Sequence, residues 1–309
     1  MEISLVTNID NRSPIDTCIQ QMTQARDEGF RRLWFTQMPY DADLLTILAV
    51  GLREVDGIDV GSGVVPIQNQ HPMLLAQRAM TLNVIGSGRF TLGIGVTHRT
   101  VTEGMWGISW DKSVRRLSEF LDGLLPLLAG ESVDAEGELV TTRGALQISG
   151  VAPEVYVAAL GPQMLRVTGR RAAGTVTWMT GPKTLKDLTR PALRAAATEA
   201  GRPDGSVKVA AALPVSVTDD VDGARAEAAK QFAMYGYLPS YRAMLDREGF
   251  TGPEEAALIG DEAAVSQRLD ELRDAGVDEF VAIPFDPSPE GRQQTRAGLR
   301  TWASRVASP

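Results

Sequence analysis

The feature that most constrains the fold is a repeated alternation of short apolar segments with segments of helical spacing. The apolar runs lie at residues 3–7, 32–36, 59–65, 90–96, 154–160, 175–179, 207–217 and 279–284. Most of them are apolar throughout rather than at every second position, which is typical of parallel strands buried on both faces. We therefore predict a parallel α/β sheet covered by helices, and eight strands favour a closed (β/α)8 TIM barrel.

Helical segments fill the intervals between these strands. They are predicted at residues 14–28, 43–53, 72–84, 111–128, 162–173, 182–200, 221–245, 263–275 and 291–306. Several begin at a proline or end at a glycine, as helices commonly do. Residues 131–150 lack a clear period and are expected to form a loop or a small hairpin. Because no stretch has the composition of a linker, we expect a single domain over residues 1–309.

The composition limits the class of partner. The chain has 39 acidic and 31 basic residues and a net charge of −8, which argues against a broad phosphate-binding face for nucleic acid. A small-molecule substrate is the expected partner. Cys18 is the single cysteine, so no intramolecular disulfide can form. The first ten residues lack a secretory signal pattern and no apolar run is long enough to span a membrane, so a cytoplasmic location is expected.

Common catalytic motifs are missing from the sequence. Gly93-Ile94-Gly95 resembles the start of a dinucleotide fingerprint, but His98 replaces the third glycine and no helix is expected to open there. No phosphate-binding loop with a conserved lysine and no G-x-S-x-G elbow occurs. With His71 and His98 in different loops and one cysteine on a helix, a metal site is not expected.

The third and fourth apolar runs end in residues that suit a strand interior poorly. Gly61, Ser62 and Gly63 interrupt the third run, which indicates close approach by a ligand or by another part of the backbone. The fourth run ends at Thr97 and His98. His98 is expected to face the mouth of the barrel, where it acts in chemistry or merely orders the loop that contains Glu103. His71 precedes a helix-initiating proline, which favours a structural role.

An anion site is indicated where the fifth strand meets the next helix. This strand ends in glycine and the helix starts at proline, so free N–H groups face a bound phosphate or simply form a β-α turn. The segment comprises Leu160, Gly161, Pro162, Gln163 and Met164.

Two sets of apolar and aromatic residues have open roles. The first set lies at the ends of the second and sixth strands and comprises Thr36, Gln37, Met38, Trp178, Met179 and Thr180. These residues either contact a flat aromatic ligand or belong to the core. The second set comprises Tyr235, Tyr237, Tyr241 and the loop 106–110. These residues form either a lid over an aromatic or unsaturated substrate or ordinary surface packing.

Three stretches of the sequence, residues 61–107, 157–182 and 256–281, resemble the luciferase-like monooxygenase superfamily. They are most similar to its actinobacterial group of oxidoreductases that use the deazaflavin coenzyme F420. The resemblance implies one luciferase-like TIM-barrel domain that works as a homodimer. It also implies an enzyme that transfers a hydride to or from a small organic substrate.

The resemblance also implies roles for individual residues. The third strand is expected to end in a bulge with a non-prolyl cis peptide at Gly63-Val64, next to Ser62, behind the central ring of the cofactor. The end of the fourth strand is expected to place Thr97 and His98 near the reactive ring, with Glu103 further along. The cofactor phosphate is expected at the segment 160–164, with Trp178, Met179 and Thr180 nearby.

Two departures from the family pattern leave alternatives open. The second strand ends in Thr36-Gln37-Met38-Pro39, without the acidic or histidine residue often found there, and the loop 68–71 is less basic than expected. One alternative is an FMN-dependent monooxygenase on the same fold, supplied with reduced flavin by a partner reductase. The other is a noncatalytic barrel that binds flavin or another metabolite.

Overall fold

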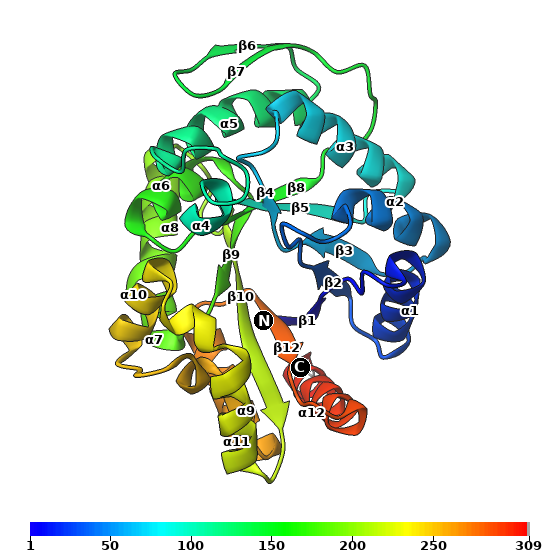
Figure 1. The fold of residues 1–309 in the computed structure, drawn as a ribbon, viewed down its shortest axis with the longest axis vertical. Helices are drawn as coiled ribbons and strands as arrows, with labels where there is room; N and C mark the ends of the chain where they lie inside the picture. Colours follow the sequence, from blue (N-terminus) through cyan, green and yellow to red (C-terminus); the bar gives the residue numbers. More distant parts are fainter. Residues whose placement is uncertain (308–309) are drawn as a thin grey trace. The chain divides into compact units, whose positions relative to one another are not determined.

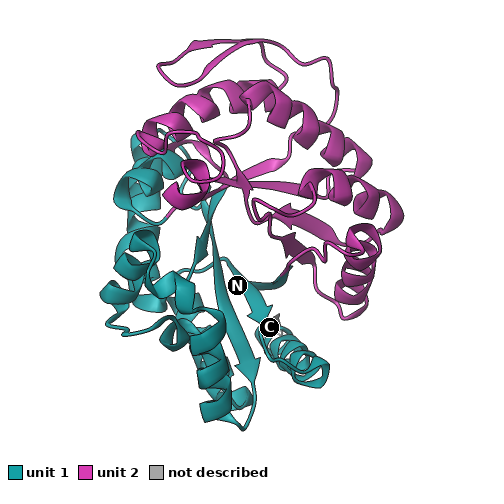
Figure 2. Ribbon diagram, in the orientation of Figure 1, with its two compact units in different colours: residues 1–6, 160–169, 174–309 teal, residues 7–159, 170–173 magenta. Residues whose placement is uncertain are grey.

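A computed structural model describes residues 1–307, and the chain falls into two compact units (Figure 2). Unit 1 comprises residues 1–6, 160–169 and the chain from residue 174 onward, whereas unit 2 comprises residues 7–159 and 170–173. The assignment of all 309 residues to one domain stays a prediction.

Unit 2 contains the middle strands of the predicted barrel. Its main strands pair in parallel in the order β2, β3, β5, β8, and the short β4 also pairs with β5. The bounds are β2 (Arg32–Phe35), β3 (Asp59–Ser62), β4 (Val65–Pro66), β5 (Phe90–Gly95) and β8 (Glu154–Ala158). A separate antiparallel pair, β6 (Val133–Glu136) and β7 (Thr141–Gly144), forms within residues 131–150, so the hairpin alternative is the one present.

The helices of unit 2 lie beside these strands, and α1 packs on α2, α2 on α3, and α3 on α5 (Figure 1). They are α1 (Pro14–Asp27), α2 (Leu44–Glu54), α3 (Pro72–Ile85), the short α4 (Arg99–Thr102) and α5 (Ser113–Leu128). Helix α5 illustrates how such a helix buries one face: its residues Leu117, Leu121 and Leu124 are three or four positions apart and almost completely buried. His71 caps α3, because its Nδ1 accepts the N–H of Met73, which confirms its structural role.

Unit 1 contains the first strand and the last strands. They pair in parallel in the order β11, β10, β12, β1, and β9 pairs with β10. The bounds are β1 (Glu2–Thr7), β9 (Gly174–Trp178), β10 (Lys208–Val217), β11 (Leu258–Gly260) and β12 (Glu279–Pro284). After its first residue β10 is buried at every position, as expected for a strand covered on both faces.

The helices of unit 1 follow β9, β10, β11 and β12, except for the first, whose residues 162–169 belong to this unit and which follows β8 in the chain. They are α6 (Pro162–Arg171), α7 (Pro182–Thr184), η1 (Leu185–Thr189), α8 (Arg190–Glu199), α9 (Val221–Gln231), η2 (Ala233–Gly236), α10 (Pro239–Glu248), η3 (Pro253–Ala256), α11 (Glu262–Asp274) and α12 (Pro289–Ala307). The segment η1 is a π-helical turn inside the predicted helix 182–200. Pro191 has no N–H to donate to the carbonyl of Asp187, which explains why the regular α-helical ladder is lost there.

The chain is a (β/α)8 barrel, and the predicted fold class is confirmed. The eight predicted strands correspond to β1, β2, β3 with β4, β5, β8, β9, β10 and β12, and their pairings are parallel. The structure adds the short strand β11, which the apolar pattern did not predict. Its three residues give too short an apolar run to stand out from the flanking turns.

Candidate active site

The third predicted strand is interrupted by a cis peptide bond. β3 ends at Ser62, the bond between Gly63 and Val64 is cis, and β4 begins at Val65. The N–H of Gly63 donates to the carbonyl oxygen of Phe35 at 2.7 Å, which joins this bend to the end of β2. The cis bond expected from the resemblance is therefore present in the chain.

The pairing with β5 shows that the interruption is a β-bulge. Gly61 pairs with Thr91 and Val65 pairs with Ile94, so four residue steps on one strand face three steps on the other. One extra residue on one strand bends that strand and redirects the backbone beyond it. The bulge lies where β3 gives way to β4, at the carboxyl end of the third barrel strand.

The Ser62 hydroxyl restores hydrogen bonding beside the bulge. It donates to the carbonyl oxygen of Gly93 and accepts the N–H of Gly93, both at 2.9 Å, and Ser62 is completely buried. A Cβ added at Gly93 would lie 1.9 Å from the Ser62 carbonyl oxygen, and one added at Gly95 would lie 2.9 Å from a methyl of Val64. These glycines therefore accommodate the bulge itself.

The next strand brings Thr97 and His98 to the carboxyl end of β5. The N–H of Thr97 donates to Gln68 Oε1 at 3.2 Å, and the Thr97 carbonyl accepts Nε1–H of Trp110 at 2.7 Å. These two bonds hold the backbone that carries His98. Burial lowers the pKa of the half-buried His98 below its usual 6.5, so its imidazole is neutral at pH 7.

The expectation that no helix opens after Gly95 is wrong. His98 precedes α4, and its backbone carbonyl accepts the N–H groups of Val101 and Thr102. A helix of only four residues has no repeating apolar spacing, so the sequence pattern did not indicate it. The third glycine of a dinucleotide fingerprint is still missing, because His98 occupies that position.

Glu103 is engaged in ordering the loop after α4. Its Oε1 accepts the backbone N–H of Trp110 at 3.2 Å, and its Oε2 lies 3.7 Å from the Arg99 guanidinium. That guanidinium stacks over the Trp110 ring at 5.4 Å and pairs with Asp111 at 3.0 Å. The surroundings of Glu103 thus favour a supporting role over direct proton transfer.

The predicted anion segment forms the exposed start of α6. The helix begins at Pro162, and its first helical bond runs from the N–H of Leu165 to the carbonyl of Gly161. Pro162 and Gln163 are exposed, and a Cβ added at Gly161 would meet no atom within 4 Å. The backbone at this helix start is therefore open to a close-fitting group.

The end of β9 offers less side-chain surface than predicted. Met179 and Thr180 are completely buried, and Met179 has a left-handed backbone with φ of 53°. The Thr180 hydroxyl donates to the carbonyl of Trp178 at 3.2 Å. Within the segment 178–180, Trp178 alone is partly exposed, so it is the residue of this segment that a ligand can reach.

The start of α7, which follows this segment, is already occupied by a carboxylate of the chain. Glu248, the last residue of α10, accepts the N–H groups of Lys183 at 3.2 Å and of Thr184 at 2.6 Å. Negative charge is favourable at a helix start, so this contact holds α10 on α7. This contact could not be predicted from the sequence pattern, because the two segments are more than sixty positions apart.

The predicted tyrosine group divides into packed and exposed members. Trp178 contacts Tyr235 at 5.4 Å between ring centroids, and Tyr235 contacts Tyr241 at 5.1 Å, both edge to face. Burial raises the pKa of Tyr241 above its usual value, and the neighbouring Tyr235 adds to the effect. Tyr237 is 86% exposed. The two packed tyrosines therefore link η2 and α10 to the end of β9, while a lid function stays a prediction.

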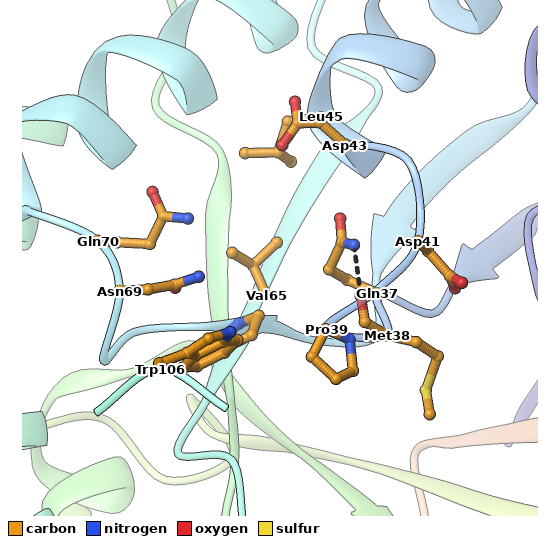
Figure 3. A pocket seen from close by; sticks show the side chains of 11 residues that line it. Gln37, Met38, Pro39, Asp41, Asp43, Leu45, Val65, Asn69, Gln70 and Trp106 are labelled. Carbon is orange, nitrogen blue, oxygen red and sulfur yellow. Dashed lines mark hydrogen bonds between the residues drawn. The ribbon is translucent and has the colours of Figure 1, made fainter. Parts of the chain in front are cut away.

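A pocket of about 180 Å³ lies within unit 2, at the carboxyl ends of its strands (Figure 3). It is formed by the loops that follow β2, β4 and α4. Its lining residues are Gln37, Met38, Pro39, Asp41, Asp43, Leu45, Val65, Pro66, Asn69, Gln70 and Trp106. Of these, the sequence pattern had singled out Gln37, Met38 and Trp106 for ligand contact.

The structure gives no candidate metal site in the described residues. No group of three or more histidine, cysteine or acidic side chains is arranged to hold a metal ion within residues 1–307. Burial raises the pKa of Cys18 to about 12, so this thiol stays protonated at neutral pH. In the same part of the chain, every helix is too short or too polar to cross a bilayer.

Comparison with known proteins places the chain among oxidoreductases. Residues 1–279 match the sequence profile of the family described as luciferase-like monooxygenase. The 5,10-methylenetetrahydromethanopterin reductase of Methanolobus tindarius is 28% identical over 297 residues, which cover 86% of this chain and 90% of the relative.

Two solved structures illustrate the likeness in fold. The coenzyme F420-dependent tetrahydromethanopterin reductase of Methanopyrus kandleri superimposes with a TM-score of 0.82 and 21% identity, over 99% of both chains. The oxygenating constituent of 3,6-diketocamphane monooxygenase from Pseudomonas putida, in complex with FMN, gives a TM-score of 0.79 and 18% identity, over 99% of this chain and 98% of that one. At these identities the likeness shows the fold alone.

Proposed function

The chain belongs to the luciferase-like monooxygenase family, and we propose that it is an oxidoreductase that uses coenzyme F420 for hydride transfer to or from a small organic substrate. The bulge at Gly63 and Val64 is the observation that supports binding of a flat cofactor ring. The named activities of the M. tindarius and M. kandleri reductases support it from outside the chain.

The residues of the candidate site fit such a coenzyme. In unit 2, the bulge gives a redirected strand end against which a flat ring can rest, and Ser62 fixes its shape from within. In unit 1, the open backbone at Gly161 and the first N–H groups of α6, at Gln163 and Met164, suit a phosphate. We assign the ring to Gly63, Val64 and Thr97, with the buried Ser62 supporting the bulge. We assign the phosphate to the segment 160–164, with Trp178, Met179 and Thr180 nearby.

Bound coenzyme F420 would supply the hydride in reduction of the substrate or accept it in oxidation, and the proton is left to the protein. A neutral imidazole both donates and accepts, so His98 can give a proton to a substrate oxygen or take one from an alcohol. Thr97 holds the backbone beside His98 through its bonds to Gln68 and Trp110. Glu103 supports the same loop through Arg99 and Trp110.

An FMN-dependent monooxygenase, supplied with reduced flavin by a partner reductase, is the second candidate. The likeness to an FMN-bound monooxygenase of the same fold favours it. It would use the same bulge to support an isoalloxazine ring, so the geometry of unit 2 serves both cofactors. The choice between the two therefore rests on binding.

Titration of the purified protein with coenzyme F420 and with FMN tests the choice. We expect the fluorescence of coenzyme F420 to change on binding, with a dissociation constant at least about tenfold below that of FMN. Gly161→Ala should weaken coenzyme binding about tenfold by placing a methyl group where the phosphate is expected, without loss of stability, because the added Cβ meets no atom of the protein within 4 Å. Tight FMN binding with no F420 binding would replace the proposal by the second candidate. Binding without turnover over a broad substrate panel would favour a noncatalytic barrel.

We also propose that the protein is a homodimer in the cytoplasm. Leu74 and Val84 on α3 are 43% and 50% exposed, and Val151 is 75% exposed, which supports a covered apolar surface. Light scattering coupled to gel filtration should give twice the mass of 33.3 kDa. A mass of one chain at micromolar concentration would remove the dimer.

A further inference from the structure

We propose that the pocket in unit 2 is a substrate subsite for a hydrogen-bond-donating organic cation, such as a primary ammonium group. Its role for the substrate rests on the proposed function, whereas its preference for a cation rests on its own lining (Figure 3).

The pocket lies where a substrate group is expected in a barrel of this type. Its walls come from the loops after β2, β4 and α4, which belong to three successive barrel strands, and active sites form at the carboxyl ends of such strands. Val65 lines the pocket and directly follows the cis Gly63–Val64 bond. A group held here therefore contacts a residue that directly follows the proposed support of the coenzyme ring in the sequence.

The charge of the lining favours a cation. Asp41 and Asp43 contribute carboxylates, whereas no lysine, arginine or histidine is among the lining residues. One oxygen of Asp41 accepts the Asn11 side-chain N–H at 2.8 Å, and one oxygen of Asp43 accepts the N–H of Thr46 at 3.0 Å. Each carboxylate has a second oxygen with which to accept from a ligand. An anionic group would meet two like charges and no cationic side chain.

Three neutral amide side chains also line the pocket, and two of them are already hydrogen-bonded within the chain. Asn69 and Gln70 lie on one side of Val65 in Figure 3, with Gln37 on the other. The Gln37 amide is already used, since it donates to the Met38 carbonyl at 2.8 Å and accepts from the N–H of Leu44. The Oε1 of Gln70 is also used, since it accepts from the Arg78 guanidinium at 3.2 Å.

Trp106 supplies an aromatic surface to the pocket, and an indole face attracts organic cations. Leu45, Val65 and Pro66 add apolar contact for a carbon chain or a ring. The cavity of about 180 Å³ equals about six water volumes, which is enough for an ammonium with a short carbon framework.

Three probes of matched shape test the charge preference. The purified full-length protein is titrated calorimetrically with 2-phenylethylammonium, 2-phenylethanol and 3-phenylpropionate, with and without coenzyme F420. We expect the ammonium to bind at least about tenfold more tightly than the carboxylate at low salt, and high salt to weaken only the ammonium. Equal affinities, or tighter binding of the carboxylate, would overturn the proposal.

Isosteric variants locate the binding. Asp41→Asn and Asp43→Asn remove charge but keep an acceptor for Asn11 and for the first turn of α2. Each should weaken the ammonium about fivefold, leave 2-phenylethanol unchanged, and together weaken the ammonium about 25-fold. Asp219→Asn makes the same charge change outside the lining and should have no effect. Ammonium binding that survives the double variant would show that the cation binds elsewhere.

The outcome is independent of the coenzyme. If the ammonium binds as expected while coenzyme F420 does not bind, the cation site stands and the proposed function fails. If coenzyme F420 binds and the probes do not discriminate by charge, the function stands and the cation site fails.

Discussion

Gly93→Ala is expected to lower the free energy of unfolding by about 3 kcal/mol or more, the upper end for overpacking a core. The added Cβ would lie 1.9 Å from the carbonyl oxygen of Ser62, which is buried backbone and cannot rotate away. Moving the strands apart also breaks the two bonds between Ser62 and Gly93. Urea denaturation monitored by tryptophan fluorescence measures the change.

Two further variants show whether the contact at Gly93 is responsible. Ser62→Ala removes the hydroxyl and leaves the buried N–H of Gly93 without its acceptor, so a smaller loss of about 1–3 kcal/mol is expected. Gly161→Ala introduces the same methyl where no atom lies within 4 Å and should change stability by less than about 1 kcal/mol. A Gly93→Ala protein as stable as Gly161→Ala would contradict the geometry of the bulge.

The barrel itself could be predicted from the sequence because its strands are nearly uniform apolar runs. The run 207–217 is one example: it became β10, which is buried at every position after Lys208. The bulge was different. The pattern showed that Gly61, Gly63, Gly93 and Gly95 suit a strand poorly, but only the family resemblance indicated a cis bond, since several local arrangements satisfy the same glycine spacing.

Contacts between distant segments could not be predicted. The sequence has no acidic residue at the end of the second strand, yet Asp41 and Asp43 enter the pocket from the loop that follows it. Glu248 reaches the start of α7 from another helix. Each contact depends on how loops fold back over strand ends, which hydrophobic periodicity does not encode.

His98→Gln is expected to lower kcat by about 10²–10⁴-fold, the usual contribution of a general acid or base. Glutamine keeps a polar group of similar size but cannot transfer a proton. The change in coenzyme F420 absorbance, with a substrate that supports turnover, measures the rate. Coenzyme affinity should stay within about twofold if His98 acts on the substrate. Unchanged kcat would exclude His98 from proton transfer.

His71→Asn is the matched control. It removes the other histidine of the chain while asparagine keeps a good N-cap for α3, so the rate should stay near that of the parent. The exposed contact between His71 Nε2 and the Thr141 carbonyl oxygen is lost, so the free energy of unfolding should fall by no more than about 1 kcal/mol. In this variant a single histidine remains, and its NMR signals report the titration of His98 directly.

The lowered pKa of His98 gives a readout that needs no substrate. The folded protein resists protonation of the buried imidazole, whereas the unfolded chain takes up a proton near pH 6.5. The unfolded state therefore binds more protons below that pH. The associated stability is fully present above about pH 6.5 and is lost as the pH falls toward the pKa of the folded state. In His98→Gln this part of the pH dependence should disappear, and an NMR titration of the His71→Asn protein should give a midpoint below 6.5. A midpoint at or above 6.5 would show that the imidazole is not desolvated, and a neutral donor at pH 7 would then no longer follow from its burial.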